Sequence, residues 1–105
     1  MKPVRLDLEA EEELAEAARW YEKQRPGLGL ELMAEVDEAI ARIPEWHGAY
    51  RLMPHVAPRF GIRRIVLARF PFSVVFMELP AEWRVLAIAH QRRRPGYWVG
   101  RLPKG

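Results

Sequence analysis

The sequence contains no cysteine among its 105 residues, which excludes a disulfide framework and a cysteine-ligated metal site. It has no apolar run long enough to span a bilayer, and its first residues lack the apolar core of a secretory signal. Internal repeats and low-complexity segments are also absent. Half of the residues are apolar and 30% are charged, which is typical of a folded protein. We therefore expect one cytoplasmic domain spanning residues 1–105, with no cofactor, no metal and no membrane partner.

Acidic residues are scarce in the second half of the chain. Residues 46–105 hold two Asp and Glu against eleven Lys and Arg, a net charge of +9, whereas residues 1–45 hold twelve against six, a net charge of −6. This asymmetry predicts either an acidic or nucleic-acid partner for the second half, or neutralisation of one half by the other on folding. Lysine is scarce too, because 14 of the 17 basic residues are Arg, whose planar guanidinium suits phosphate and carboxylate groups.

The first half of the sequence predicts a strand followed by two helices. Residues 4–8 alternate apolar and polar side chains, the period of a half-buried strand. Residues 9–24 and 28–43 each carry an apolar stripe at helical spacing, with a break between them and Pro44 ending the second helix. The glutamates of the first helical turn are expected to be a solvated cluster that complements the helix dipole. Two such helices joined by a tight break form a helical hairpin.

The second half predicts a surface loop and three strands. Residues 44–60 hold three prolines and show no period, whereas residues 62–70, 72–79 and 83–90 are rich in strand formers and lie close together in sequence. The short connections imply antiparallel hairpins. The resulting order β-α-α-β-β-β predicts an α+β domain in which the helical hairpin packs on a small antiparallel sheet. The first strand is expected beside another strand or at the sheet edge, with no register fixed.

The end of the last predicted strand has unusual chemistry. His90 closes the apolar run, Arg92, Arg93 and Arg94 follow, and Tyr97 and Trp98 come after a Pro-Gly break. Guanidinium groups beside aromatic faces favour a docking surface for an anionic macromolecule. The alternatives are a solvated arginine cluster, a histidine that only hydrogen-bonds nearby backbone, and two aromatic side chains that fold back over the sheet or helices.

Five motifs in this order resemble the RelE/ParE superfamily of toxins from bacterial type II toxin–antitoxin systems. They are Ala17-Ala18-Arg19-Trp20-Tyr21-Glu22, Pro26-Gly27-Leu28-Gly29, Arg63-Arg64, Phe70-Pro71-Phe72 and the segment from Ala89 to Trp98. The resemblance covers nearly the whole chain. It implies a protein that poisons an essential process when free and is neutralised by a cognate antitoxin wrapped over the helical hairpin and sheet. Trp20 and Tyr21 are adjacent, so both cannot face the core, and we expect antitoxin contact there.

The superfamily has two branches, and the sequence favours the one that is not enzymatic. The mRNA-cutting branch is expected to present an arginine near the start of the strand at residues 72–79, where this chain has Ser73. Serine cannot hold a developing negative charge as a guanidinium does. The resemblance therefore favours a ParE-like inhibitor of DNA gyrase over a metal-independent endoribonuclease that acts on mRNA in the ribosome. An inactive module that only binds antitoxin is a third alternative.

Each branch assigns roles to particular residues. For gyrase inhibition, the expected target contacts are Arg64, Arg92, Arg93, Arg94 and Trp98. For RNA cleavage, the acid, base and cation roles fall to His90, Arg93 and Tyr97, with Arg64 as an added phosphate contact.

Overall fold

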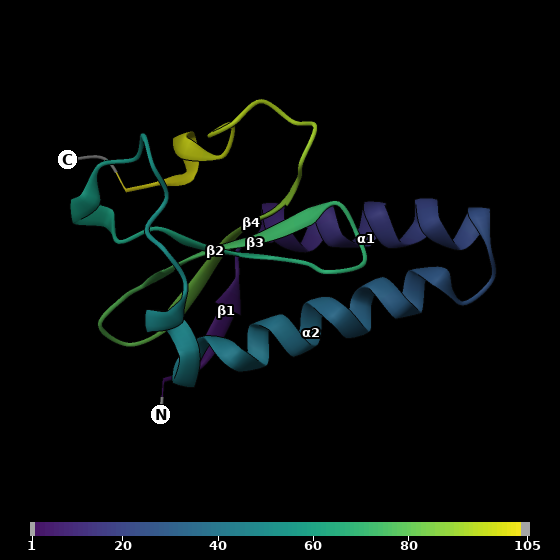
Figure 1. The fold of residues 1–105 in the computed structure, drawn as a ribbon, viewed down its shortest axis with the longest axis horizontal. Helices are drawn as coiled ribbons and strands as arrows, with labels where there is room; N and C mark the ends of the chain where they lie inside the picture. The colour runs from purple at the N-terminus through teal and green to yellow at the C-terminus, as the bar shows by residue number, and fades with distance from the viewer. Residues whose placement is uncertain (1, 104–105) are drawn as a thin grey trace.

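The computed structural model describes residues 2–103 and has the predicted order of elements (Figure 1). The helices and strands are β1 (Val4–Leu6), α1 (Leu8–Gln24), α2 (Leu28–Trp46), β2 (Arg63–Val66), β3 (Phe72–Glu78) and β4 (Trp83–His90). Three 3₁₀ turns are η1 (His47–Ala49), η2 (Pro58–Phe60) and η3 (Val99–Arg101). The two helices form the expected hairpin, which packs on one face of the sheet, and no helix within residues 2–103 is long and apolar enough to cross a membrane.

The strands form one sheet in the order β1-β4-β3-β2. β3 pairs antiparallel with both β2 and β4, as the short connections predicted. β1 runs parallel to β4, with Val4 opposite Trp83 and Leu6 opposite Val85, so the sheet is mixed and not wholly antiparallel. No hairpin turn constrains this pair, because both helices and two strands lie between β1 and β4 along the chain.

Three element boundaries differ from the prediction by two residues or more. β1 ends at Leu6 and not at residue 8, because Asp7 is the N-cap and Leu8 the first residue of α1. α2 continues through Pro44 to Trp46, because the proline removes only one amide and the ladder resumes where His47 N donates to Ile43 O. β2 ends at Val66 and does not reach residue 70, because the chain then turns toward α2. The turn is closed by the Glu35 carboxylate, whose Oε2 accepts hydrogen bonds from the backbone amides of residues 68 and 69 at 2.7 and 3.3 Å.

The helical hairpin is held together where the start of α2 lies against the last turns of α1. Gly29 lies against α1 so tightly that a Cβ there would be 2.4 Å from the carbonyl oxygen of Ala18. From the last turn of α1, the Glu22 carboxylate accepts hydrogen bonds from Gly27 N at 2.7 Å and Gly29 N at 3.0 Å. It thereby satisfies amides at the start of α2 that have no helical partner. Two of the motifs noted in the sequence, at residues 17–22 and 26–29, therefore form one structural contact.

Both faces of the sheet are buried along β3 and most of β4. Phe72, Val74 and Phe76 of β3 point toward the helices, on the face predicted from their spacing. Val75 of β3 points to the opposite face, where the 50–62 loop and the C-terminal segment cover a second apolar cluster that contains Trp98. Trp98 is 2% exposed. The C-terminal segment is therefore part of the packed domain, as the fold-back alternative predicted.

Candidate functional site

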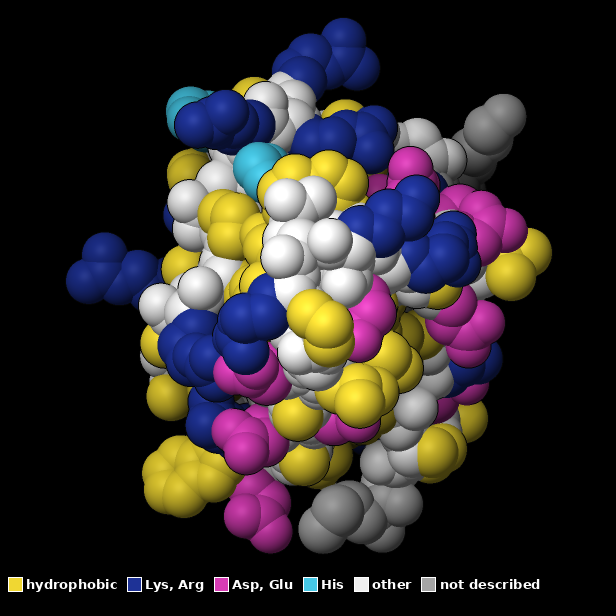
Figure 2. Space-filling view, turned by 90° about the vertical axis from the view of Figure 1, so that its right-hand side faces the viewer, with side chains coloured by type: hydrophobic (Ala, Val, Ile, Leu, Met, Phe, Trp, Pro, Cys, Tyr) yellow, Lys and Arg dark blue, Asp and Glu magenta, His cyan; other side chains and the backbone are white. Residues whose placement is uncertain are grey.

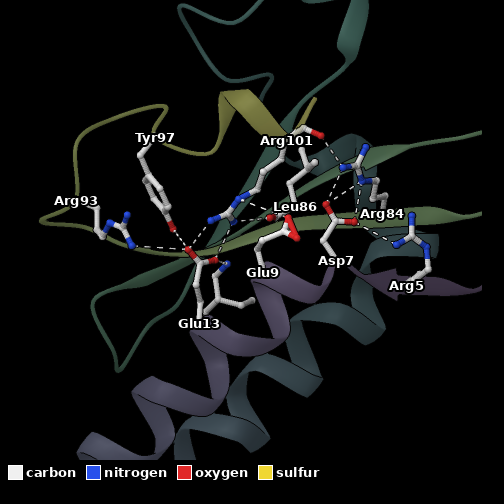
Figure 3. Close-up of polar contacts among 10 residues, drawn as sticks. Arg5, Asp7, Glu9, Glu13, Arg84, Leu86, Arg93, Tyr97 and Arg101 are labelled. Atoms are coloured by element: carbon white, nitrogen blue, oxygen red, sulfur yellow. Dashed lines mark hydrogen bonds and ion pairs between the residues drawn. The ribbon is translucent and has the colours of Figure 1, made fainter. Parts of the chain in front are cut away.

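The acidic first helix and the basic C-terminal segment meet around the carboxylate of Glu13 (Figure 3). Tyr97 Oη donates to Glu13 Oε2 at 2.5 Å, and the two terminal nitrogens of Arg101 donate to the two carboxylate oxygens at 3.1 Å each. The amide of Ile88 in β4 donates to Glu13 Oε1 at 3.0 Å. Four donors thus converge on a side chain that is only 15% exposed. We call Glu13, Tyr97 and Arg101 the Glu13 cluster.

The environment of Tyr97 makes its phenol a structural donor. Burial and the hydrogen bond to Glu13 both raise the pKa of the Tyr97 hydroxyl well above its usual range. A general acid works best when its pKa lies near the operating pH. The phenol is also occupied by the carboxylate, so this arrangement disfavours the acid or base role that the enzymatic alternative gives to Tyr97.

A second buried ion pair holds the far end of the C-terminal segment. The Arg84 guanidinium binds both oxygens of Asp7 at 2.7 to 3.0 Å and donates to the carbonyl of Arg101 at 2.7 Å. Arg101 in turn donates to Leu86 O at 2.8 Å. Asp7 stands at the N-cap position of α1 but makes no side-chain cap bond, because its carboxylate is used by Arg84 and Arg5.

His90 contacts its own segment. Its Nδ1 accepts a hydrogen bond from the backbone amide of Arg92 at 3.0 Å. Its ring stands edge-on to the ring of Phe72, with 4.9 Å between the two ring centroids. His90 therefore makes the hydrogen bond to nearby backbone that was one of the alternatives considered from the sequence. Because Nδ1 is an acceptor, the neutral ring carries its hydrogen on Nε2.

The three consecutive arginines have different surroundings. Arg93 lies over the Tyr97 ring at 3.8 Å and 3.9 Å from Glu13 Oε2, with 54% of its side chain exposed. Arg92 and Arg94 are exposed and form no ion pair within residues 2–103. One arginine is thus partly neutralised, and the other two keep their full charge for solvent or a partner.

A hollow of about 140 Å³ lies under the C-terminal segment, on the sheet face opposite the helices. Three arginines line it: Arg64 of β2, Arg93 and Arg94. The buried Ser73 of β3 and Trp98 also line it. None of its lining residues within the described chain is Asp or Glu. We call this hollow the arginine hollow. In Figure 2, Lys and Arg side chains gather at the top of the molecule, where the C-terminal segment lies in Figure 1.

A larger groove of about 370 Å³ lies between α1 and the end of β4. We call it the aromatic groove, and its lining residues are Glu13, Glu16, Ala17, Trp20, Tyr21, Phe72, Ile88, His90, Arg93 and Tyr97. Trp20 is 57% exposed, whereas Tyr21 is half-buried. The Tyr21 ring stands edge-on to the Phe70 ring, with 5.1 Å between the two ring centroids. The structure therefore brings both residues expected to contact antitoxin to the same groove.

The structure gathers most of the predicted site residues and adds two. Arg64, Arg93, Arg94 and Trp98 line the arginine hollow, but Trp98 lies buried as part of its floor, without exposed surface for a target. Arg92 is exposed and does not line the hollow. The sequence did not identify Glu13 and Arg101 as site residues, because the glutamates of α1 were interpreted as solvated. The available signal was the position of Glu13 beside the apolar stripe of its helix. No group of three His, Asp or Glu within residues 2–103 is arranged to hold a metal ion.

Comparison with known proteins identifies the fold. Among solved structures, a chain from the "Chromosomal ParDE TA system from P. aeruginosa" superposes with a TM-score of 0.71 at 22% sequence identity, covering 86% of this chain and 96% of that chain. No family model and no curated protein matches the sequence. The superposition confirms the RelE/ParE-like α+β fold expected from the sequence motifs.

Proposed function

We propose that this chain is the cytoplasmic toxin of a bacterial type II toxin–antitoxin system, and that it binds a cognate antitoxin. The observation that carries the proposal is the fold shared with the ParDE system over 86% of the chain. Two surface features support it. The aromatic groove offers the exposed Trp20 beside half-buried aromatic side chains, which suits a protein partner, and the arginine hollow offers unneutralised guanidinium groups to an anionic target.

The target that the site favours is DNA gyrase. We infer that the chain inhibits gyrase by binding it, without catalysing a reaction. Ser73 stands where the enzymatic branch is expected to carry an arginine, and the Tyr97 hydroxyl is held by Glu13. What remains at the surface is a set of fixed positive charges: Arg64, Arg94 and the neighbouring Arg92. Such a surface binds an anionic macromolecule by charge complementarity, and its binding weakens as salt rises.

Two assays test this proposal. Induction of the chain alone in a bacterial host is expected to arrest growth, and co-expression of the adjacent reading frame is expected to restore it. Purified protein is then expected to inhibit gyrase supercoiling at micromolar concentration. Normal growth on induction would instead identify an inactive module that only binds antitoxin.

A ribosome-dependent endoribonuclease is the second candidate, and one observation favours it. His90, Arg93 and Tyr97 line both the arginine hollow and the aromatic groove, so the three residues assigned to RNA cleavage do lie together. Primer extension on translated mRNA distinguishes this candidate, because it predicts new cuts within codons at the ribosomal A site. Cuts that persist in His90→Ala, Arg93→Ala and Tyr97→Phe would exclude the assigned roles.

A further inference from the structure

The hydroxyl of Ser73 lacks a hydrogen-bond partner within residues 2–103, although Ser73 is only 6% exposed. The two unpartnered polar side-chain atoms that are fully enclosed in this part of the chain belong to Glu35 and His47. The Ser73 hydroxyl is not one of them, so it reaches the space of the arginine hollow, which Ser73 lines. Buried polar groups in folded proteins nearly always have a partner, and an exception calls for an explanation.

The position of Ser73 in the sheet places it at the floor of the arginine hollow. Phe72 and Val74 pack toward the helices, and because side chains alternate along a strand, Ser73 points to the opposite face. Its neighbour across the sheet is Ala89 of β4, which also lines the hollow. The methyl group of Ala89 is too small to cover the hydroxyl. The floor of the hollow therefore offers a hydrogen-bond donor.

The walls of the hollow carry positive charge that the chain does not neutralise. Arg64 comes from β2 and Arg94 from the C-terminal segment, and neither forms an ion pair within residues 2–103. Arg93 also lines the hollow, but it lies 3.9 Å from Glu13 Oε2 (Figure 3). The hollow thus holds two full positive charges and part of a third.

The backbone that carries Arg94 is fixed by contacts of its own segment. Tyr97 N donates to Arg94 O at 3.1 Å and closes a turn in which Gly96 has a φ of 75°. Beyond the turn, Tyr97 is bound to Glu13, and Trp98 is 2% exposed. A ligand in the hollow therefore meets donors on an ordered backbone, which reduces the entropy lost on binding.

We infer that the arginine hollow binds one phosphate monoester, with the Ser73 hydroxyl as a donor at its floor. A monoester carries nearly two negative charges at neutral pH and three acceptor oxygens, which match the charges of Arg64 and Arg94. Guanidinium groups bind phosphate oxygens through paired hydrogen bonds. The volume of about 140 Å³ equals the space of several water molecules at ~30 Å³ each, which is enough for the phosphate group.

The charge of the hollow distinguishes a monoester from other anions. A phosphate in a nucleic-acid backbone carries one negative charge, as does a carboxylate. The hollow also offers no free aromatic face to a base, because the guanidinium centres of Arg93 and Arg101 lie 3.8 and 5.3 Å from the Tyr97 ring centroid and Trp98 is buried. Recognition is therefore of the terminal phosphate itself, whether it belongs to free phosphate or to a nucleotide. This inference goes beyond the proposed function and does not depend on it.

Small phosphate compounds test the inference directly. Methyl phosphate, dimethyl phosphate and acetate are titrated into the ¹⁵N-labelled full chain at about pH 8, where a monoester carries two charges. We expect methyl phosphate to shift the amide signals of Ser73, Ala89 and Gly96 in a saturable way, and to bind at least tenfold more tightly than the other two. The amides of Glu16 and Ala17, which line the aromatic groove and not the hollow, are the internal control.

Inorganic phosphate and adenosine monophosphate distinguish the two sources of the group. Equal affinity of the two compounds would show that the phosphate alone supplies the binding. Tighter binding of adenosine monophosphate would identify a nucleotide as the ligand. Both outcomes support the site.

Variants of the protein separate the hydroxyl from the charges. Ser73→Ala is expected to weaken methyl phosphate binding at least threefold without loss of stability in urea unfolding, because the hydroxyl has no partner in the chain to lose. Arg64→Ala and Arg94→Ala are each expected to weaken binding at least fivefold. Arg51→Ala removes an exposed arginine that does not line the hollow, and it is expected to change the affinity less than twofold.

The outcomes separate this inference from the proposed function. Absence of a saturable shift, equal affinity for dimethyl phosphate, unchanged affinity in Ser73→Ala, or equal weakening in Arg51→Ala each overturn the monoester site. If induction of the chain still arrests growth in that case, the proposed function stands. If methyl phosphate binds as expected but induction does not arrest growth, the monoester site stands and the proposed function fails.

Discussion

Tyr97 donates a hydrogen bond to Glu13 Oε2 at 2.5 Å across 84 positions of sequence, and this contact joins the acidic and basic halves of the chain. Arg101 binds the same carboxylate, so part of the positive charge of the second half is neutralised internally. Arg92 and Arg94 take no part in this contact. Internal neutralisation therefore explains the charge at the Glu13 cluster, and an anionic partner for the arginine hollow stays a prediction.

Tyr97→Phe is expected to lower the free energy of unfolding by about 1 to 2 kcal/mol, because it deletes one hydrogen bond to a charged acceptor while Arg101 and Ile88 still bind Glu13. Glu13→Gln is expected to cost more, about 2 to 4 kcal/mol, because it leaves Arg101 partly buried without its carboxylate. Urea unfolding measures both changes. Glu12→Gln, on the exposed side of α1, is the matched control and is expected to be nearly neutral. Equal stability of all three variants would contradict the role of the Glu13 cluster.

The raised pKa of Tyr97 predicts a loss of stability at alkaline pH. The phenol ionises in the unfolded chain near its ordinary pKa of 10.0, whereas the folded state holds it protonated to higher pH. The stabilising contribution is therefore complete below pH 10 and declines as the pH rises beyond that value. The difference in unfolding free energy between the native chain and Tyr97→Phe is expected to be constant from pH 7 to 9 and to shrink above pH 10. A difference that stays constant to pH 11 would show that folding does not shift this titration.

Gly29→Ala tests the contact between the helices. The added Cβ would lie 2.4 Å from the Ala18 carbonyl, so the helices must separate, and we expect a loss of about 2 to 3 kcal/mol in urea unfolding. Gly48→Ala is the matched control, because a Cβ there meets no atom within 4 Å. Glu22→Ala is expected to cost about 1 to 2 kcal/mol through the loss of its bonds to the start of α2. A neutral Gly29→Ala would mean that the hairpin packs less closely than described.

Local periodicity predicted most of this fold, and long-range contacts account for the rest. The alternation in residues 72–76 gave the correct faces of β3, and the short connections gave the antiparallel strands. The parallel pairing of β1 had no local signal, since its partner lies 79 positions away, from Val4 to Trp83. The bond between Glu13 and Tyr97 is of the same kind. Glutamates near the start of a helix complement its dipole in any context. Only the tertiary fold shows that Glu13, which lies one turn beyond the first-turn glutamates Glu9 and Glu11, binds arginine.

The arginine hollow predicts which cations serve the target. Arg64→Ala and Arg94→Ala are each expected to reduce gyrase inhibition at least fivefold with unchanged stability, because both side chains line the hollow and form no ion pair within residues 2–103. Arg51→Ala removes an exposed arginine that does not line the hollow, and it is expected to keep full inhibition. The inhibition assay at two salt concentrations gives a further check, since loss of a surface charge also reduces the salt dependence of binding. Equal inhibition by all three variants would place the target contact elsewhere.

Two exposed tryptophans on different parts of the surface allow a matched test of the antitoxin contact. Trp20 is 57% exposed and lines the aromatic groove, whereas Trp46 is 58% exposed at the end of α2 and does not line it. Trp20→Ala is expected to weaken antitoxin binding at least tenfold, because a large aromatic side chain at a groove is a typical anchor of an interface. Trp46→Ala removes the same side chain and is expected to change binding less than twofold. Calorimetry with the product of the adjacent reading frame measures both affinities, and unfolding curves check that each variant is as stable as the native chain. The opposite order, with Trp46→Ala the weaker binder, would place the antitoxin at the end of α2 and away from the aromatic groove.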